Sequence, residues 1–529
     1  MNGTKCGIRL GSSVRLAAIV SVVAASWVTQ PAWGQHRGRE VVDGVRTNRL
    51  IPGEPYDLLG KRVVFTNWYY IQPGDLDWVN KAGESVYVKG NEGPNDAIFV
   101  GKEPPRGIRI RARKPQVIGP LELPHRTILQ DGTIYRGWSN DAYYESTDGM
   151  HWDRKADLVF DKEKDGVQHV FIDPKAPASE RFKSVWVDTI TEQEFDAFRE
   201  KRPDGWEPRA LLHFKEKREA SCLRGSVSAD GITWKTLADP IVVEYADTLN
   251  TCYYDQFLEK YVLYTRQWSV GPRTLKLESD IRTSWTGVGR RAIGRSESED
   301  FRSFPPSEMI LEPTPQMLPS EVLYTNCHTT VPVAPDQHLM FPAIWNASVN
   351  DATRIVMASS HDGINWHWIP DGDILETQPF GQWNGGCVWA NPEMIEFPDG
   401  TWALPYTAHN VPHKYPRGQR KGGLGYAIWP QGRMVALEAP DAGQFTMIPI
   451  MAPGRTLKIN AVTKRTGGIR IEVAGVESHS FDDCTLIFGD RYWTVVDWKG
   501  KTDLGFEEGK PVTLRFKLDQ AEIYGIEFE

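Results

Sequence analysis

The sequence has no surplus of positive charge. Its 529 residues include 61 lysines and arginines against 69 aspartates and glutamates, which gives a formal net charge of -8. Proteins that bind nucleic acids use clustered lysine and arginine to displace the counterions of the phosphates. We therefore expect no nucleic-acid partner for this chain.

Long apolar runs are absent after the first residues. The N-terminus has basic residues up to Arg15, an apolar stretch over residues 16–28, and small residues at 32 and 34 in front of Gln35. This is the pattern of a secretory signal peptide. An uncleaved anchor is the alternative, but a bilayer needs about 20 apolar residues. We expect residues 1–34 to be removed, the mature protein to be secreted or periplasmic, and no membrane span after cleavage.

Cysteine is also scarce, with six residues, of which Cys6 lies in the leader. The other five are an odd number without the spacing of zinc ligands, so an exported protein could pair some of them and leave one over. His409 and His413 are four residues apart, but Pro412 opposes a helix that would place both on one face. There is no Walker loop, dinucleotide fingerprint or nucleophile elbow. We expect no cofactor and no metal, and the oligomeric state stays open.

The chain is rich in turn-forming and aromatic residues. It contains 47 glycines, 36 prolines, 20 tryptophans, 18 tyrosines and 20 phenylalanines, and 40% of its residues are hydrophobic. Such a composition supports a large core and favours short strands joined by tight turns over helical bundles. We therefore expect an all-β protein.

One short motif, S-x-D-G-x-x-W, occurs three times. The copies span residues 146–152, 228–234 and 360–366, and a degenerate copy spans residues 298–304. In such a turn the Asp and Ser side chains accept backbone N–H bonds, and the glycine supplies a positive φ. Successive aspartates of the series are 82, 70 and 62 residues apart. This spacing is typical of propeller blades with insertions.

The sequence around these copies alternates like strands. The clearest runs are residues 260–266, 338–341, 354–359 and 401–406. A capping box at Thr191 to Glu194 predicts one helix, which continues to Lys201 and which we place near the rim of the second blade.

The chain divides into four regions on this basis. They are the signal peptide (1–34), a small N-terminal β region (35–118), a five-bladed β-propeller (119–432) and a C-terminal β-sandwich (433–529). Short β runs at roughly ten-residue spacing favour a sandwich for the last region.

Several motifs resemble those of secreted bacterial proteins similar to glycoside hydrolase family 32. The S-x-D-G-x-x-W turns look like sialidase Asp boxes, and Phe171 to Pro174 resembles the R-D-P motif of the family, with Ile172 in place of the arginine. Residues 65–68, 247–250, 323–326 and 509–516 match further features of these proteins, and the order of propeller and sandwich is the same. The resemblance implies a five-bladed propeller glycosidase fold, although fold alone does not establish activity.

The sequence departs from that family at two of its catalytic motifs. The W-M-N-D-P-N-G run, which carries the nucleophile, is absent. The acid/base of the family lies in a W-E-C-P-D motif. The most similar segment of this sequence is Trp389 to Glu393, which has Ala390 in the place of the glutamate. Hydrolysis of fructans is therefore not expected from the motifs.

Glycoside hydrolysis needs two carboxyl groups across one site, and the first strands of propeller blades converge on such a site. Our candidates are Asp173, Asp247 and Glu393. Each has a structural alternative. Asp173 precedes a proline and could form a turn, Asp247 could form an Asx turn, and Glu393 could be a solvated neighbour of Glu396.

A sugar site also needs aromatic faces and hydrogen-bond donors. Seven residues are candidates for substrate binding, and a structural role is the alternative for them: Arg136, Trp138, Arg266, Asn326, His328, Trp345 and Trp383. Together these residues predict a secreted glycoside hydrolase that acts on the terminal sugar of an extracellular polysaccharide. The alternative is a propeller that binds carbohydrate without cleaving it.

Overall fold

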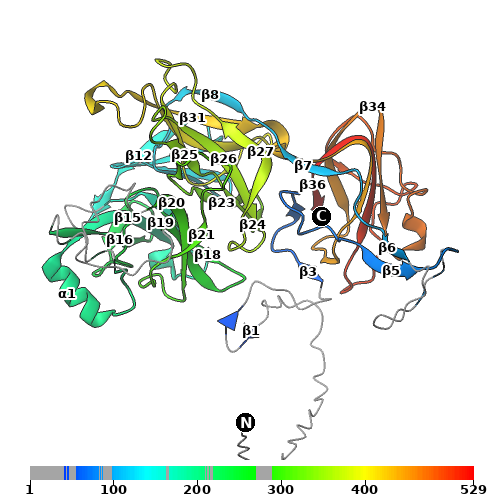
Figure 1. The fold of residues 1–529 in the computed structure, drawn as a ribbon, viewed down its shortest axis with the longest axis horizontal. Coiled ribbons are helices and arrows are strands. Elements are labelled where there is room, and N and C mark those ends of the chain that lie inside the picture. Colours follow the sequence, from blue (N-terminus) through cyan, green and yellow to red (C-terminus); the bar gives the residue numbers. More distant parts are fainter. Residues whose placement is uncertain are drawn as a thin grey trace, which may run out of the picture. The chain divides into compact units, whose positions relative to one another are not determined.

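The computed structural model describes most of the mature chain. The described residues are 41–42, 45–46, 55–82, 84, 86, 98–161, 166–208, 210, 214, 218–269 and 289–529. The predicted signal peptide, residues 1–34, lies outside them. Strands dominate the described segments (Figure 1), which confirms the all-β expectation. In these segments, no helix has the length and hydropathy that a bilayer crossing requires.

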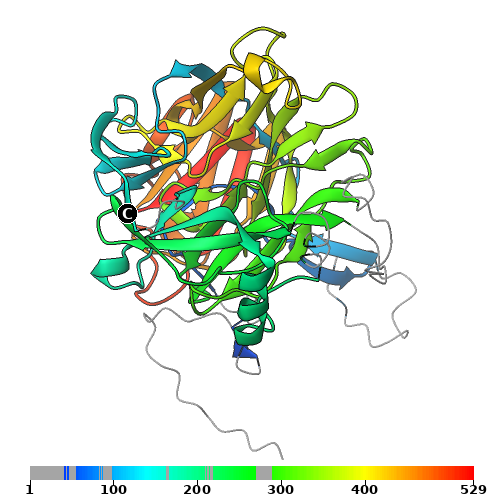
Figure 2. The same ribbon diagram turned by 90° about the vertical axis from the view of Figure 1, so that its left-hand side faces the viewer.

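Five sheets form the blades of a propeller. In Figure 2 the blades follow one another around a ring in chain order, from cyan through green to yellow. Blade 1 consists of β9 (Thr127–Asp131), β10 (Ile134–Trp138), β11 (Ala142–Ser146) and β12 (Asp153–Asp157). Blade 2 consists of β14 (His169–Ile172), β15 (Phe182–Thr191), β16 (Glu219–Ser228) and β17 (Thr233–Thr236), with β13 (Val159–Phe160) beside β17. Blade 3 consists of β18 (Thr251–Asp255), β19 (Lys260–Ser269), β20 (Arg290–Ser298) and β21 (Glu308–Leu311).

The last two blades are less regular. Blade 4 contains β22 (Glu321–Leu323), β23 (His328–Val331), β24 (Ala334–Met340), β25 (Ala343–Asn346), β26 (Thr353–Ser360) and β27 (His367–Leu375). Blade 5 contains β28 (Cys387–Ala390), β29 (Ile395–Glu396), β30 (Trp402–His409), β31 (Gly422–Trp429) and β8 (Gln116–Leu121).

Strand β8 closes the ring. It precedes blade 1 in the chain, yet it pairs antiparallel with β31 of blade 5, with Ile118 opposite Tyr426. Closure removes free sheet edges, which would otherwise pair with other chains. β8 spans residue 119, where the sequence places the start of the propeller.

The three S-x-D-G-x-x-W copies fold into the same turn, each between the last two strands of its blade. In the first copy, Ser146 Oγ accepts from the backbone N–H of Gly149 at 2.8 Å, and Asp148 Oδ1 accepts from that of Met150 at 2.8 Å. Trp152 Nε1 then donates to the Gly149 carbonyl at 3.1 Å. The glycines have positive φ values of 75°, 77° and 70° at positions 149, 231 and 363. The bonding predicted from the motif is confirmed.

Each of these turns also packs on a neighbouring blade. The carbonyl of Gly231 in blade 2 accepts from Trp138 Nε1 of blade 1 at 2.7 Å. The carbonyl of Gly363 in blade 4 accepts from Tyr264 Oη of blade 3, also at 2.7 Å. The motif therefore joins blades as well as strands.

The strands outside the propeller form a second β-structure. β34 (Leu457–Val473) lies between β35 (Asp490–Val495) and β36 (Leu514–Phe528), and the sheet continues through β32 (Val435–Thr446) to β7 (Arg109–Ala112), with β4 (Arg62–Val63) also paired to β36. Register shifts interrupt β34 between Thr463 and Gly468 and β32 between Ala439 and Ala442, so the long strands contribute to more than one part of the fold. These strands include the region for which the sequence predicts a C-terminal β-sandwich, and they pair as one six-stranded sheet.

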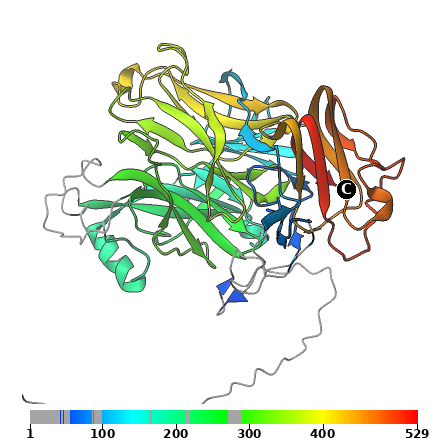
Figure 3. The ribbon, with the colours of Figure 1, turned by 45° about the vertical axis from the view of Figure 1, so that its right-hand side comes forward.

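N-terminal strands complete this region. Figure 3 shows blue strands of the N-terminal segment beside the orange and red C-terminal strands. The remaining short pairs are β1 (Val41–Val42) with β2 (Val45–Arg46), β3 (Tyr56–Asp57) with β33 (Ile450–Met451), and β5 (Asp75–Val79) with β6 (Ile98–Lys102). Arg62 is buried and donates to Glu527 Oε2 at 2.9 and 3.0 Å, so residues from both flanks share one core.

The predicted helix is present as α1 (Glu192–Lys201), between β15 and β16 of blade 2 (Figure 1). Thr191 caps it: its side chain accepts from the backbone of Glu194, and the Glu194 side chain accepts from Thr191 in return. All four strand runs predicted for the propeller also fall in strands, namely β19, β24, β26 and β30.

The five cysteines in the described part of the chain are buried free thiols. They are Cys222, Cys252, Cys327, Cys387 and Cys484. Burial raises the pKa of Cys222, Cys252 and Cys327. These thiols pack as small apolar side chains.

Candidate functional site

The five blades enclose a cavity of about 310 Å³, which we call the funnel. Its wall is formed by residues 125–126, Gln168, residues 247–249, residues 324–325, residues 389–392, Thr407, His409, His413 and Arg420. The first three segments come just before the first strands of blades 1 to 3, residues 324–325 lie between β22 and β23 of blade 4, and the others belong to blade 5. The volume lies at the lower end of the range of ligand pockets, about 300–1,000 Å³.

Rings and imidazoles cover one side of the funnel. The ring of Trp389 lies 4.9 Å from that of His409 and 5.6 Å from that of His413. Tyr324 Oη shares a hydrogen bond of 2.9 Å with His413 Nε2. Burial and the charge of Arg420 lower the pKa of His409 to about 4, and burial with Lys414 and Arg420 lowers that of His413 to about 4. Both imidazoles are therefore neutral at pH 7.

Two arginines reach the funnel without a carboxylate partner among the described residues. Arg126 Nε donates to the amide oxygen of Asn140 at 2.6 Å, and burial lowers the pKa of Arg126. Arg420 also lines the wall, and no acidic side chain of the described segments lies within ion-pair distance of it.

Asp247 is the one predicted catalytic residue that lines the funnel. Its carboxylate pairs with Arg266, which also donates to the carbonyl of Tyr245 at 3.1 Å. The Asp247 side chain is 47% exposed, whereas that of Arg266 is 1% exposed. The buried Arg266 thus fixes the more exposed carboxylate of Asp247 at the wall. The guanidinium of Arg266 lies 4.3 Å from the ring of Tyr245.

Glu393 directly follows wall residues Asn391 and Pro392, in the irregular link between β28 and β29. One carboxylate oxygen lies 3.2 Å from His169 Nε2 and the other accepts from Thr329 Oγ1 at 3.1 Å. The side chain is 24% exposed. Its φ of 71° is uncommon for a residue with a side chain and costs of order 1–3 kcal/mol. Contacts from blades 2 and 4 therefore fix a strained acidic residue inside the ring.

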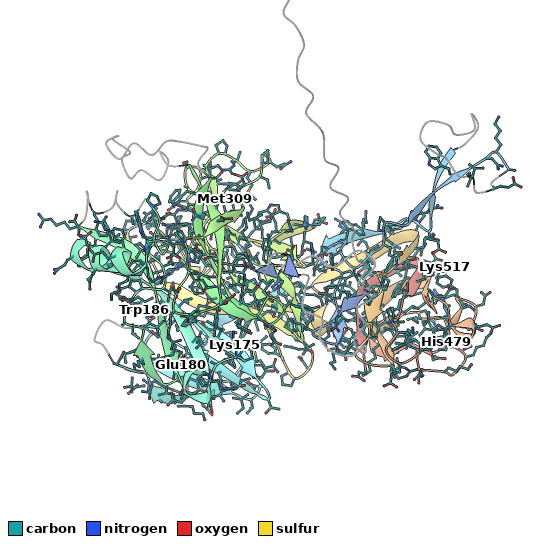
Figure 4. The ribbon with its side chains drawn as sticks, turned by 90° about the horizontal axis from the view of Figure 1, so that it is seen from below. Lys175, Glu180, Trp186, Met309, His479 and Lys517 are labelled. Atoms are coloured by element: carbon teal, nitrogen blue, oxygen red, sulfur yellow. The ribbon has the colours of Figure 1, made fainter. Side chains whose placement is uncertain are left out.

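Asp173 does not reach the funnel. It lies at the end of β14 that is remote from Gln168, and five residues of strand span about 16 Å. Its carboxylate accepts from Tyr261 Oη at 2.7 Å and pairs with Lys183 at 3.3 Å, and its side chain is fully buried. Lys175 and Glu180 mark the following turn in Figure 4. The three predicted carboxylates thus occupy three different environments.

The predicted binding residues of blades 1 and 5 also lie outside the funnel wall. Arg136 donates to Asp131 at 2.7 Å and contacts Tyr143. Trp138 is fully buried and contacts the turn of blade 2, as described above. Trp383 is half-buried against β8 and β31, where a side chain on Gly119 or Gly425 would meet its ring.

Asn326, His328 and Trp345 are buried in blade 4. Asn326 accepts from Thr251 Oγ1 at 2.8 Å and so links blades 3 and 4. His328 Nε2 lies 3.2 Å from a ring nitrogen of His338, and burial lowers its pKa well below the ordinary value. Trp345 Nε1 donates to Asp351 at 2.9 Å. Their predicted roles in binding stay predictions, and none of the three lines the funnel.

Sequence reasoning missed most of the funnel wall. The residues it did not select include His125, Arg126, Gln168, Tyr324, Trp389 and Arg420. A usable signal existed for blades 1 to 3, where the wall residues come just before the first strand of each blade. His409 and His413 were considered as metal ligands, and in the described part of the chain no three His, Cys, Asp or Glu side chains form a group that could hold a metal ion.

The described part of the chain contains further cavities. One of about 470 Å³ shares Arg126 and Gln168 with the funnel and is also lined by Trp186, labelled in Figure 4, and Asp188. Asp188 pairs with Arg224 at 2.6 Å. A separate groove of about 920 Å³ is lined in part by Trp68 and Trp368.

Comparisons with known proteins yield only distant structural likenesses. No protein-family profile matches the chain, and no curated protein sequence does. Among solved structures, it is similar to a thermostable family-43 glycoside hydrolase (11% identity over 57% of this chain and 86% of that one, TM-score 0.36). It is also similar to a xylan beta-1,4-xylosidase from Bacillus halodurans (9% identity over 79% of this chain and 99% of that one, TM-score 0.34). A further similar structure is an exo-beta-1,3-galactanase from Phanerochaete chrysosporium with beta-1,3-galactotriose (9% identity over 88% of this chain and 99% of that one, TM-score 0.32).

These structural neighbours are glycosidases. With TM-scores below 0.5, the likenesses assign neither a family nor an activity to the chain. The resemblance to family 32 stays a prediction, and the function must be argued from the residues of the funnel itself.

Proposed function

We propose that the protein binds a terminal saccharide unit in the funnel of its propeller, outside the cytoplasm. The observation that supports this most is the composition of the wall. Segments of all five blades combine the planar side chains of Tyr324 and Trp389 with polar groups such as Asn391 and Gln168. Apolar faces with a few directed polar groups are what sugar rings require.

Asn391 illustrates how firmly the polar groups are held. Its side-chain oxygen accepts from Thr407 Oγ1 at 2.9 Å, and its side-chain nitrogen donates to the carbonyl of His125 at 3.2 Å. These contacts join blade 5 to blade 1 and fix the direction of the amide. A rigid wall reduces the conformational entropy that binding costs.

The test is binding of the mature chain, residues 35–529, to an array of polysaccharides, followed by titration of the best ligand. Trp389→Ala removes a ring from the wall, and we expect its affinity to fall by about tenfold or more. Trp68→Ala is the matched control, because Trp68 is 50% exposed and lies outside the funnel. Equal affinity of the two variants, or no binding to any polysaccharide, would contradict the proposal.

The proposed location outside the cytoplasm can be tested separately. This part of the proposal rests on residues 1–34 alone, which lie outside the described structure. N-terminal sequencing of the protein recovered from the periplasm and the culture medium should begin at Gln35. Recovery only from the cytoplasm, with Met1 retained, would refute export.

A second candidate function is glycoside hydrolysis with exo action on a terminal sugar. It is favoured by Glu393, a partly exposed and strained carboxylate that adjoins the wall, with Asp247 as the second acid. One carboxyl group would protonate the leaving oxygen while the other acts as nucleophile or base. Hydrogen bonds from His169 and Thr329 orient Glu393, and the ion pair with Arg266 orients Asp247.

Kinetics separate the two functions. If the chain is a hydrolase, Glu393→Gln and Asp247→Asn each lower kcat by about 100-fold or more while the fold persists. Asp173→Asn is the contrast, since its buried pair with Lys183 predicts a loss of stability first. Binding without turnover of any array ligand would leave saccharide binding as the function.

A further inference from the structure

We propose that the saccharide unit bound in the funnel carries a negative charge, as a carboxylate or a sulfate ester, and that Arg126 and Arg420 recognise it. This inference rests on the proposed saccharide binding and names the class of sugar. It follows from three properties of the wall: its charge, its unpaired donors and its neutral imidazoles.

The charge of the wall is positive. Among the described residues of the wall, Asp247 is the one acidic side chain, and it already forms an ion pair with Arg266. Arg126 and Arg420 have no such partner among the described residues. Elsewhere in the described segments, Arg224 pairs with Asp188 and Arg62 with Glu527, whereas Arg202 and Arg290 donate to backbone carbonyls. An anionic group in the funnel would give Arg126 and Arg420 the ion pair that the described residues do not supply.

The wall also contains three polar atoms that have no partner within the described part of the protein, namely Trp389 Nε1, His409 Nδ1 and His413 Nδ1. They are shielded from water-sized molecules, so an oxygen of a ligand in the funnel does not reach them in this arrangement. The donors that an anion can meet are therefore the guanidiniums of Arg126 and Arg420, each of which presents several N–H groups.

The imidazoles reinforce this preference. His409 and His413 are kept neutral by burial and by the positive charge of Arg420. A bound anion would offset that charge and reduce the cost of protonating the rings. Protonation would in turn convert both ring nitrogens of each histidine into donors. An anion and the histidines would therefore strengthen each other's interaction as the pH falls.

The experiment compares polysaccharides that differ only in charge. Polygalacturonate is titrated against its fully methyl-esterified form, and a sulfated galactan against its chemically desulfated form. The protein is the mature chain, at low salt and at about 0.15 M salt. We expect the charged member of at least one pair to bind about tenfold or more tightly, with an affinity that falls as salt rises.

Variants connect this preference to the two arginines. Arg420→Ala and Arg126→Ala should each remove most of the difference in affinity between the two members of a pair, and Arg420→Lys should retain part of that difference. Arg465→Ala, an exposed arginine on β34, is the matched control and should have no effect.

The outcomes are distinct. Preference only in the first pair identifies a carboxylate, preference only in the second identifies a sulfate ester, and preference in both identifies a general anion site. Equal binding within both pairs, or a charge preference that survives both alanine variants, overturns this inference and leaves saccharide binding intact. Absence of binding to any polysaccharide overturns both proposals.

Discussion

Tyr426 in β31 of blade 5 donates its phenolic hydrogen to the carbonyl of Gly149 in the turn of blade 1, at 2.7 Å. The same carbonyl accepts from Trp152 Nε1 within its own turn. Trp138 and Tyr264 make the corresponding contacts to Gly231 and Gly363. The motif that recurs in the sequence therefore provides three joints between blades, and Tyr426 closes the ring where the last blade meets the first.

Replacing Tyr426 by Phe tests this joint. The ring is buried, so the variant keeps the packing and loses one enclosed hydrogen bond, which should lower the free energy of unfolding by about 1–1.5 kcal/mol. Denaturant unfolding followed by tryptophan fluorescence measures the change. Tyr415→Phe is the control, because Tyr415 is 38% exposed, and an equal effect from both variants would argue against the joint.

Gly149→Ala tests why the turn needs glycine. The φ of 75° alone costs an alanine about 1–2 kcal/mol, and the new Cβ would lie 2.6 Å from the ring of Phe397 in blade 5. Gly132→Ala is a matched control, since Gly132 has a φ of 65° and no atom within 4 Å of the added Cβ. We expect Gly149→Ala to cost about 1–3 kcal/mol more than Gly132→Ala in the same unfolding experiment. Equal costs would mean that strain, and not contact with blade 5, explains the glycine.

The turns could be predicted because their bonds are local. Ser146, Asp148 and Gly149 satisfy one another within a few residues, so the pattern is visible in the sequence. The helix at Thr191 could be predicted for the same reason. The pairing of β8 with β31 and of β4 with β36 could not, because Arg62 and Glu527 are separated by 465 positions and no local pattern records such a distance.

The site was harder to predict than the fold. Gln168 lines the funnel and Asp173 is buried remote from it, although both belong to one short strand and its flanks. The alternation of side chains along the strand identifies β14, but it does not show which end of the strand faces the cavity. A family-like motif directed attention to Asp173, and the search for aromatic faces directed it to Trp345, whereas Arg126 and Arg420 lie in irregular segments that carry no periodic signal.

Glu244 should make stability depend on pH. It is fully buried, and burial, with the nearby Glu207, raises the pKa of Glu244 from 4.5 to about 7. The folded state therefore holds the proton more tightly than the unfolded state. This contribution is complete below pH 4.5 and is lost as the pH rises through 7, by on the order of 3 kcal/mol.

Glu244→Gln removes this titration and still accepts a hydrogen bond from the backbone N–H of Ser307. We expect the free energy of unfolding to fall less between pH 5 and pH 8 in this variant than in the parent. Glu477→Gln, at an exposed position, should change nothing in that range. Parallel curves for the parent and Glu244→Gln would show that Glu244 stays ionised when folded.

His409 and His413 should make stability depend on pH in the opposite direction. The pKa of each is lowered from 6.5 to about 4, chiefly by burial. The unfolded chain therefore takes up protons before the folded chain does, and stability is lost as the pH falls from 6.5 to 4. His409→Gln and His413→Gln should flatten the decline of the Tm over that interval, and His367→Gln, on the exposed side of β27, should not.

The anion proposal sharpens this last prediction. A bound anion raises the imidazole pKa values, so affinity should rise as the pH falls from 7 towards 5. A sulfate ester stays ionised throughout, and the rise should continue to pH 4. A carboxylate begins to take up its own proton near pH 4, so its affinity should pass through a maximum. Titrations of the charged polysaccharides across pH 4–7 measure this, and an affinity that falls steadily with pH for both ligands would show that the histidines do not face the anion.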